Sequence, residues 1–91
     1  MATVFIPAAL RKLTAGCERA TAHGRNLGRL IDDLDRQFPG FRAYLVEDGE
    51  LKPSIAVSID GEIATGGLLE PVSESGEVHF LPALGGGTRF E

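Results

Sequence analysis

The sequence predicts a single α+β domain in which one amphipathic helix packs across a mixed sheet of four to five strands. One apolar stripe recurs with helical spacing in the first half of the chain, and short runs of alternating apolar and polar residues lie on both sides of it. The 91 residues are 43% hydrophobic and 24% charged, which suits one modest hydrophobic core. One helix combined with several strands predicts a sheet that is covered on one face.

The first segment predicts a strand, a helical turn and a second strand. Apolar and polar side chains alternate over residues 3–6, and Pro7 ends that run. Residues 8–14 favour a helical turn, which ends at Gly16 because glycine readily adopts a positive φ. Weak alternation over residues 17–22 predicts a strand that pairs with the first one as a hairpin.

The main helix is predicted over residues 26–38. Asn26 is a suitable N-cap, because its side-chain oxygen can accept a hydrogen bond from an unpaired backbone N–H group of the first turn. Pro39 and Gly40 end the helix. The apolar stripe, at positions i, i+3, i+4, i+7 and i+11, consists of Leu27, Leu30, Ile31, Leu34 and Phe38.

The polar face of this helix carries several carboxylates. A spacing of four residues predicts ion pairs between Arg29 and Asp33 and between Asp32 and Arg36. Asp32, Asp33 and Asp35 are also candidates for acid–base chemistry or for a metal site. A solvated helix surface is the ordinary explanation of such a row, and we expect it here.

The second half of the chain predicts the rest of the sheet. Residues 42–46 remain open between a helical turn and a short strand. Asp60 and Gly61 are a strong hairpin signal, because both tolerate the positive φ of a tight turn. The elements around them are a polar turn over 47–50, a strand over 55–59, a return strand over 62–64, a turn over 73–76 and a last strand over 77–81 with Val78 and Phe80 on one face.

Composition excludes several classes of protein. The net charge of −4 argues against a module that binds phosphate backbones, so no nucleic-acid partner is expected. No run approaches the about 20 apolar residues that span a bilayer. The first residues lack the pattern of a signal peptide, so we expect a cytoplasmic protein that does not bind membranes.

Few residues favour catalysis or metal binding. Cys17 is the single cysteine, which excludes an intramolecular disulfide, a four-thiolate zinc site and a four-cysteine iron–sulfur cluster. We expect a small buried thiol at Cys17. His23 and His79 do not form a metal site without carboxylate partners, and His79 is expected to be partly buried and hydrogen-bonded. The sequence therefore predicts no catalytic residue and no metal site.

Charge is distributed unevenly along the chain. Residues 1–25 carry four basic side chains and one acidic side chain, a net charge of +3, whereas residues 26–91 carry five basic and twelve acidic side chains, a net charge of −7. One explanation is an ordinary solvated surface. The other is that the acidic later segment docks on a basic partner. The sequence does not decide between them.

The glycine-rich segments do not form a phosphate-binding loop. Gly66 and Gly67 lack the lysine and the helix that follow such a loop, and they also lack the spacing of a dinucleotide-binding motif. Gly85, Gly86 and Gly87 precede neither a lysine nor a helix. This last run is therefore predicted to be either an exposed arm or a frayed end.

Four segments carry a family resemblance: Val4–Pro7, Leu27–Leu34, Ile55–Glu62 and Glu77–Gly87. Over residues 3–87 the chain resembles the MoaD/ThiS family of ubiquitin-like sulfur carriers. The specific part is the ending, in which an aromatic residue, one further residue and proline shortly precede Gly–Gly. The resemblance implies a β-grasp (ubiquitin-like) roll over residues 1–81, a flexible arm over 82–87 and a removable tail over 88–91.

The resemblance also implies that this chain is acted on by enzymes and is not one itself. A partner that resembles ubiquitin-activating enzymes uses ATP to adenylate the carboxylate of Gly87, and sulfur then displaces AMP to leave a thiocarboxylate. A synthase accepts this sulfur in the biosynthesis of cysteine or of another sulfur-containing metabolite, and the carrier itself binds no cofactor. Docking on these partners is expected to use Phe80, Leu81, Pro82 and Leu84.

The segment Thr88–Glu91 departs from the family pattern, because Gly87 then has no free carboxylate. We expect a zinc metalloprotease of the JAB/MPN type to cleave between Gly87 and Thr88. Three alternatives remain open. The chain is the small subunit of molybdopterin synthase, a ubiquitin-like modifier that forms an amide with a lysine of its target, or a binding module without C-terminal chemistry.

Overall fold

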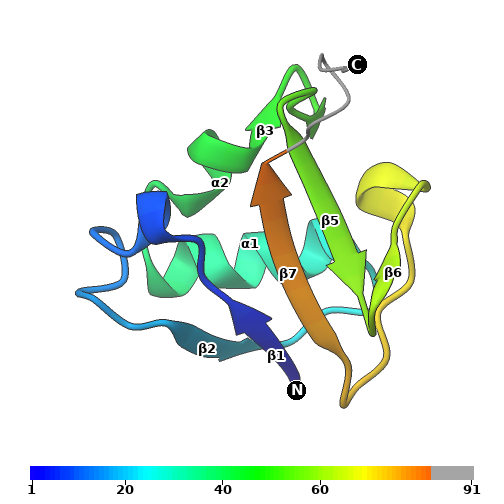
Figure 1. The fold of residues 1–91 in the computed structure, drawn as a ribbon, viewed down its shortest axis with the longest axis horizontal. Helices are drawn as coiled ribbons and strands as arrows, with labels where there is room; N and C mark the ends of the chain where they lie inside the picture. Colours follow the sequence, from blue (N-terminus) through cyan, green and yellow to red (C-terminus); the bar gives the residue numbers. More distant parts are fainter. Residues whose placement is uncertain (83–91) are drawn as a thin grey trace, which may run out of the picture.

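A five-stranded mixed sheet with one long helix across one face forms the body of the molecule (Figure 1). The computed structural model describes residues 1–82. The strand order is β2-β1-β7-β5-β6, in which β1 and β7 are parallel and the other neighbours are antiparallel. The predicted α+β architecture is therefore confirmed. The strands of this sheet are β1 Ala2–Phe5, β2 Arg19–Ala22, β5 Ile55–Ile59, β6 Glu62–Ile63 and β7 Glu77–Pro82.

The parallel pair β1 and β7 lies at the centre of the sheet. Thr3 pairs with Glu77 and Val4 with Val78, so both strands start at the same end of the sheet. Parallel neighbours cannot be joined by a tight turn, and the chain between them includes the helix that crosses the sheet. The chain therefore leaves the sheet at the end opposite to the one at which β1 begins.

The N-terminal hairpin forms as predicted but with shorter elements. A single 3-10 turn, η1 Ala8–Leu10, follows β1. The connection then reverses at Ala15 and Gly16, which have φ values of 55° and 87°. The buried hydroxyl of Thr14 donates to the carbonyl oxygen of Cys17 at 2.9 Å, so the reversal is held by a buried hydrogen bond.

The main helix α1 spans Leu27–Gln37, within one residue of the prediction at each end. The side-chain oxygen of Asn26 accepts a hydrogen bond from the backbone N–H of Arg29 at 2.9 Å, which confirms the predicted N-cap. Gly24 packs directly on the start of the helix, where a Cβ atom would collide with the backbone of Arg29 and Leu30. Glycine at this position therefore lets the incoming chain lie against the helix.

The ambiguous segment after the main helix is a helical turn, α2 Phe41–Leu45. Gly40 precedes it with a φ of 99°, and Asp35 Oδ1 accepts hydrogen bonds from the backbone N–H groups of Gly40 and Arg42 at 3.1 and 3.0 Å. A carboxylate at the start of this turn satisfies donors that would otherwise lack a partner, which favours the helix over a strand.

Two hairpins and a second 3-10 turn complete the fold. Asp60 and Gly61, with φ values of 53° and 86°, connect β5 to β6 and confirm the predicted hairpin. Asp48 and Gly49, with φ values of 56° and 78°, form an equivalent turn. The remaining elements are β3 Val46–Glu47 and β4 Glu50–Leu51, which pair with each other, and η2 Gly67–Leu69.

The core lies between the sheet and α1. Leu27, Leu30, Ile31 and Leu34 of the helix are all fully buried, which confirms that the apolar stripe faces the sheet. Phe38 is only partly buried at the edge of this cluster. The rest of the core comes from the strands, from α2 and from the segment that follows β1, and consists chiefly of Val4, Ile6, Leu10, Phe41, Leu45, Val57, Val78 and Phe80.

Truncation of the helix stripe is expected to destabilise the protein strongly. Leu30→Ala or Leu34→Ala should lower the free energy of unfolding by about 2–5 kcal/mol, because each leaves a cavity under the helix. Urea denaturation measures this change. Leu69→Ala is the control, since Leu69 is 80% exposed and its truncation should change the free energy by less than about 0.5 kcal/mol. Equal, small changes at all three positions would contradict the assignment of the core.

Candidate functional site

The predicted C-terminal arm follows β7, the last strand that the structure describes. Pro82, which the sequence assigned to the arm, is the last residue of β7 and pairs with Ile55 of β5. The other predicted arm, docking and cleavage residues, Leu84, Gly85, Gly86, Gly87 and Thr88, lie outside the described residues. The structure therefore locates the strand from which the arm continues, and it does not test the arm itself.

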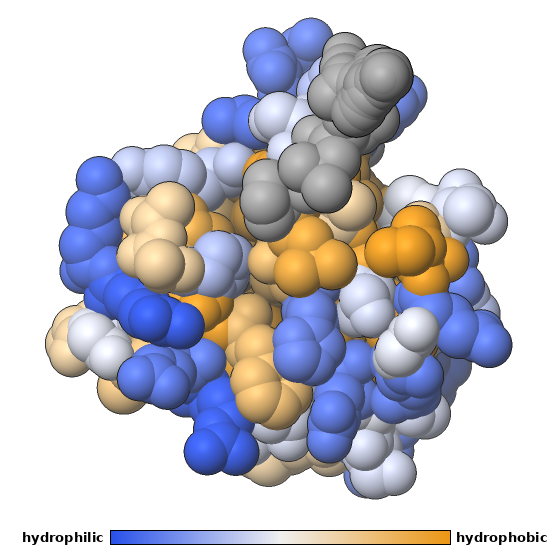
Figure 2. Space-filling view, viewed as in Figure 1, coloured by the Kyte–Doolittle hydropathy of each residue, from blue (hydrophilic) through white to orange (hydrophobic). Residues whose placement is uncertain are grey.

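An apolar groove lies beside the end of β7. Its volume is about 550 Å³, and the walls come from η1, α2, the start of β5 and the last residues of β7. Figure 2 shows apolar surface over the upper part of β7. Such a groove at the base of an arm is suited to contact with a partner protein. Its lining residues are Pro7, Ala8, Ala9, Leu10, Tyr44, Leu45, Lys52, Ser54, Ile55, Phe80 and Leu81.

The two described docking candidates have different environments. Phe80 is only 4% exposed and packs edge-on against Phe41, with the ring centroids 6.2 Å apart, so it forms a buried wall of the groove. Leu81 is 39% exposed, since it faces the opposite side of the strand. Of the two, Leu81 is the side chain that a partner can reach.

The sequence did not reveal two further residues beside this groove. Tyr44 of α2 is 39% exposed and lines the groove. The ammonium group of Lys12 lies 5.5 Å from the centre of the Tyr44 ring. This cation–π contact joins the turn that follows η1 to α2. The residues are far apart in sequence, and no motif links them, so only the fold brings them together.

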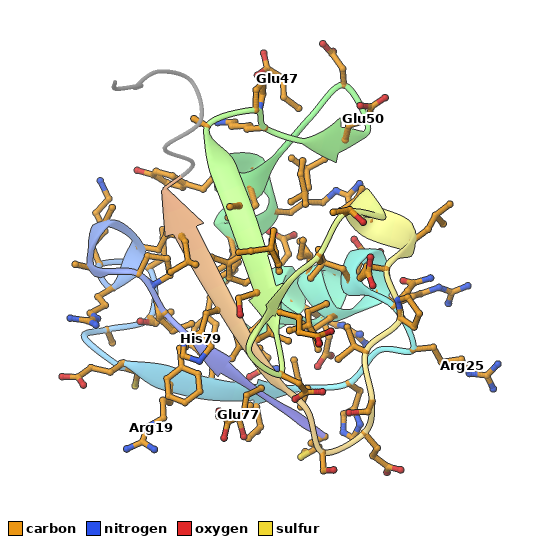
Figure 3. All side chains as sticks on the ribbon, turned by 45° about the vertical axis from the view of Figure 1, so that its right-hand side comes forward. Arg19, Arg25, Glu47, Glu50, Glu77 and His79 are labelled. Atoms are coloured by element: carbon orange, nitrogen blue, oxygen red, sulfur yellow. The ribbon has the colours of Figure 1, made fainter. Side chains whose placement is uncertain are left out.

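A stacked row crosses the open face of the sheet. Phe5 of β1 pairs with Arg19 of β2 on one side and with His79 of β7 on the other. The Phe5 and His79 rings stack with their centroids 4.1 Å apart, and the Arg19 guanidinium lies 5.7 Å from the Phe5 ring. Figure 3 shows Arg19 and His79 together on this side of the molecule. His79 is partly buried as expected, but among residues 1–82 its ring has a stacking partner and no hydrogen-bond partner.

The helix carboxylates form other pairs than the sequence predicted. Asp33 Oδ1 accepts from Arg36 at 3.0 Å, and Asp32 pairs with Arg42 of α2, so the predicted Arg29–Asp33 and Asp32–Arg36 pairs are wrong. The physical reason is competition from outside the helix. Asp33 Oδ2 accepts the backbone N–H of His23 at 2.9 Å, which turns its side chain toward β2.

These carboxylates therefore connect elements of the fold. Asp33 ties the end of β2 to α1, and Asp35 caps α2. Within residues 1–82 no group of three potential metal ligands gathers. Hydrogen bonding explains these side chains more fully than the solvated surface that we expected.

Cys17 is exposed, so the prediction of a buried thiol is wrong. The chain at this point has just reversed direction at Ala15 and Gly16, and Thr14 takes the buried position instead. The weak alternation over residues 17–22 continues as a strand only from Arg19. Cys17 therefore lies in a surface turn before β2.

A family model of the ThiS family matches residues 4–87, nearly the whole sequence. The chain belongs to the ThiS family. It is 32% identical over 90 residues to the sulfur carrier protein CysO of Mycobacterium tuberculosis, a match that covers 93% of this chain and 97% of that protein. It is thus a CysO homologue from a family of sulfur carriers.

Solved structures agree with the family assignment. A chain of the BexX/CysO complex from Amycolatopsis orientalis matches with a TM-score of 0.88 and 34% identity. The match covers 96% of this chain and 100% of that one. SAMP1 from Haloferax volcanii matches with a TM-score of 0.70 and 28% identity, over 94% and 98% of the two chains. The β-grasp fold that the resemblance implied is therefore confirmed for this ThiS-family chain. Across residues 1–82, neither helix is long and apolar enough to cross a membrane.

Removal of the Asp33 charge is expected to make stability less dependent on pH. The backbone N–H of His23 is the largest cause that lowers the Asp33 pKa from 3.8, and Gln37 and Arg36 add to it. A carboxylate with a lowered pKa in the folded state stabilises the fold at neutral pH, and this contribution is lost as pH falls through that lowered pKa. Asp33→Asn should therefore be less stable than the native chain at neutral pH, and the difference should shrink below about pH 4.

Urea denaturation at several pH values measures this difference. Asp48→Asn is the control, because Asp48 is exposed and asparagine tolerates its positive φ. We expect the control to follow the native chain at every pH. If the difference in free energy of unfolding between Asp33→Asn and the native chain stays constant into strong acid, the charge of Asp33 does not contribute to stability.

Proposed function

We propose that this chain carries sulfur on Gly87, as a thiocarboxylate that is donated in the biosynthesis of cysteine or of a sulfur-containing metabolite. One observation carries the proposal: the family match runs to Gly87 and ends there. The similarity to CysO, in sequence and in fold, favours this role over the small subunit of molybdopterin synthase.

The chemistry requires activation of a free carboxylate. In the first step a carboxylate oxygen of Gly87 attacks the α-phosphate of ATP and pyrophosphate leaves. In the second step sulfide-level sulfur attacks the acyl carbon and AMP leaves, which forms the thiocarboxylate. The active-site groups for both steps belong to partner enzymes, and this chain contributes the reacting carboxylate.

The described part of the chain suits this role as a handle. The groove beside β7 offers apolar surface next to the strand that leads to Gly87, and Leu81 is exposed at its rim. We expect Leu81, together with Pro82 and Leu84, to contact the adenylating enzyme and the sulfur-accepting synthase. The CysO chain of Amycolatopsis orientalis has been solved in complex with BexX, which supports a protein partner of sulfur transfer for this homologue.

Activation is expected to depend on removal of the tail. The residues Thr88–Glu91 hold the Gly87 carbonyl in a peptide bond, so a protease, of the JAB/MPN zinc type, must release its carboxylate first. The chain that ends at Gly87 should support ATP–pyrophosphate exchange with an activating enzyme from the same cell, and the 91-residue chain should not. Exchange by the 91-residue chain at the same rate would overturn the maturation step.

Intact-mass analysis of the protein recovered from its own cell tests the product. We expect a species that ends at Gly87 and is heavier than the free acid by the difference between sulfur and oxygen. Gly87→Ala is the matched variant, because a Cβ atom at the reacting residue hinders close backbone approach in a narrow channel. Full sulfur loading of this variant would argue against a channel that requires glycine.

A second candidate is conjugation to other proteins. It is favoured by the likeness to SAMP1 of Haloferax volcanii, and the related structure from Methanosarcina acetivorans is named small archaeal modifier protein 1. A modifier would leave a glycine remnant on lysines of its targets. A proteome that carries such remnants from this chain, with no sulfur on Gly87, would decide for the modifier.

Docking through the groove has a direct test. In the chain that ends at Gly87, Leu81→Ser should reduce kcat/KM of adenylation about tenfold, in the range of an interface residue whose contact is lost. Leu69→Ser is the control, because Leu69 is also an exposed leucine but lies on η2, outside the groove lining. Equal effects of the two substitutions would show that the groove is not a docking surface.

A further inference from the structure

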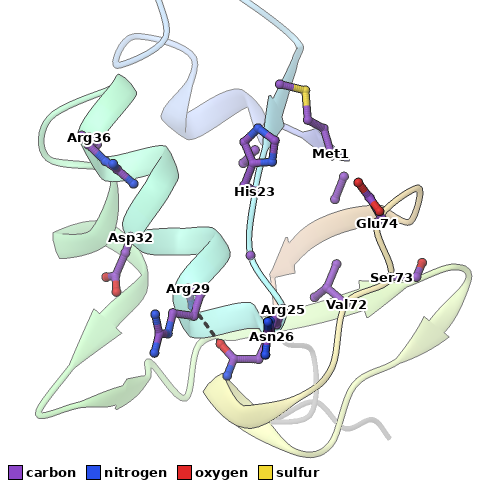
Figure 4. A pocket seen from close by; sticks show the side chains of 13 residues that line it. Met1, His23, Arg25, Asn26, Arg29, Asp32, Arg36, Val72, Ser73 and Glu74 are labelled. Carbon is purple, nitrogen blue, oxygen red and sulfur yellow. Dashed lines mark hydrogen bonds between the residues drawn. The ribbon is translucent and has the colours of Figure 1, made fainter.

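A second, polar groove lies at the opposite end of the sheet from the end of β7. Its volume is about 910 Å³, and it forms where β1 begins, beside the chain that enters α1. Figure 4 shows Arg29, Asp32 and Arg36 on one side of it and Glu74 on the other. The lining residues are Met1, Ala2, Ala22, His23, Gly24, Arg25, Asn26, Arg29, Asp32, Arg36, Val72, Ser73 and Glu74.

The walls of this groove are fixed by backbone contacts. The N–H of Val72 donates to the carbonyl oxygen of Arg25 at 3.0 Å, and the N–H of Leu27 donates to that of Glu70 at 2.9 Å. Gly24 lies directly on the helix backbone, as described above. The backbone that forms the groove is therefore part of the folded body.

Three arginines but only two carboxylates line the groove. Asp32 already pairs with Arg42, which lies outside the lining. Arg36 pairs with Asp33 through one nitrogen at 3.0 Å, and its side chain is still 77% exposed. Within residues 1–82, Arg25 and Arg29 are exposed and neither forms an ion pair. The groove thus presents unpaired guanidinium groups on a protein whose net charge is −4.

The spacing of the arginines indicates the size of the ligand. Arg29 and Arg36 are seven residues apart on α1, which is two turns or about 10 Å along the helix. Arg25 precedes the N-cap Asn26, so it lies beyond the N-terminal end of α1. A single phosphate cannot reach this whole row, whereas an extended peptide with carboxylates on alternate residues presents one every about 6.6 Å. Guanidinium groups match carboxylates in a planar, bidentate geometry.

We propose that this groove binds an acidic segment of a partner protein. Because β7 has six residues and spans about 20 Å, the groove lies that far from Pro82, the residue from which the chain continues toward Gly87. A partner can therefore hold the groove while a different protein engages the arm. The proposal does not depend on what chemistry takes place at Gly87.

The test is an NMR titration of the full chain with a short synthetic peptide of alternating Glu and Ser, at low ionic strength. We expect the backbone amides of residues 23–29 and of Ser73 and Glu74 to shift, and those of Phe80 and Leu81 to stay in place. The same peptide with Gln in place of Glu should not bind. Shifts spread over the whole surface, or saturable shifts confined to the arm end, would overturn the proposal.

Paired variants test the role of charge. Arg25→Gln with Arg29→Gln should weaken binding of the acidic peptide about tenfold, at roughly threefold for each exposed ion pair. Lys12→Gln with Arg19→Gln removes the same charge outside the groove and should change affinity less than about twofold. Glu74→Gln removes a lining carboxylate and should strengthen binding. Equal loss in the two double variants, or weaker binding by Glu74→Gln, would contradict a specific acidic-peptide site.

Two further probes separate this ligand from other anions. Inorganic phosphate and a single-stranded oligonucleotide are titrated under the same conditions. We expect both to shift the groove amides less than the acidic peptide at equal concentration of charge. If phosphate alone binds as tightly as the peptide, the groove is a small-anion site, and if the oligonucleotide binds more tightly, the partner is a nucleic acid; either result overturns the proposal.

Discussion

The parallel pairing of β1 with β7 is the constraint on which the rest of the structure depends. Because β7 lies between β1 and β5, the chain that leaves the β1–β2 hairpin has to reach the other side of the sheet before β7 can pair with β1, and α1 makes that crossing while it buries its apolar stripe. The same pairing sends the chain out at the far end of β7. The covered core therefore lies between two grooves, an apolar one beside the end of β7 and a polar one at the other end of the sheet.

The elements that the sequence predicted well are those with strong local signals. The period of the Leu27–Phe38 stripe, the Asn26 cap and the Asp60–Gly61 turn each follow from a few neighbouring residues, and all three are present. The segment at Phe41–Leu45 was ambiguous because its helical state depends on a carboxylate six residues upstream of Phe41, Asp35, whose hydrogen bonds no local pattern reveals. Local periodicity decides an element only where no distant side chain competes.

The candidate site divides in the same way. The glycine run and its resemblance to a family are visible in the sequence, whereas only the structure shows that Leu81 is exposed and Phe80 is buried. The apolar groove cannot be seen in the sequence, because its walls come from η1, α2, β5 and β7. Residues such as Tyr44 join it only through the fold. The predicted helix ion pairs failed for a related reason, because Asp33 bonds to the backbone of His23 and Asp32 to Arg42 of another element. A charged side chain pairs with the nearest suitable group in the folded structure, and residue spacing along one helix reveals only the partners on that helix.

The central position of β7 also governs how the molecule responds to force. The strand is hydrogen-bonded on both edges, to β1 and to β5, and its pairing with β5 continues to Pro82. Tension between the N-terminus and the end of β7 slides two parallel neighbours past each other, which loads their hydrogen bonds together instead of opening them one at a time. Under such a load the hydrogen bonds between β1 and β7 have to break together, so the sheet holds β7 firmly at the end from which the chain continues.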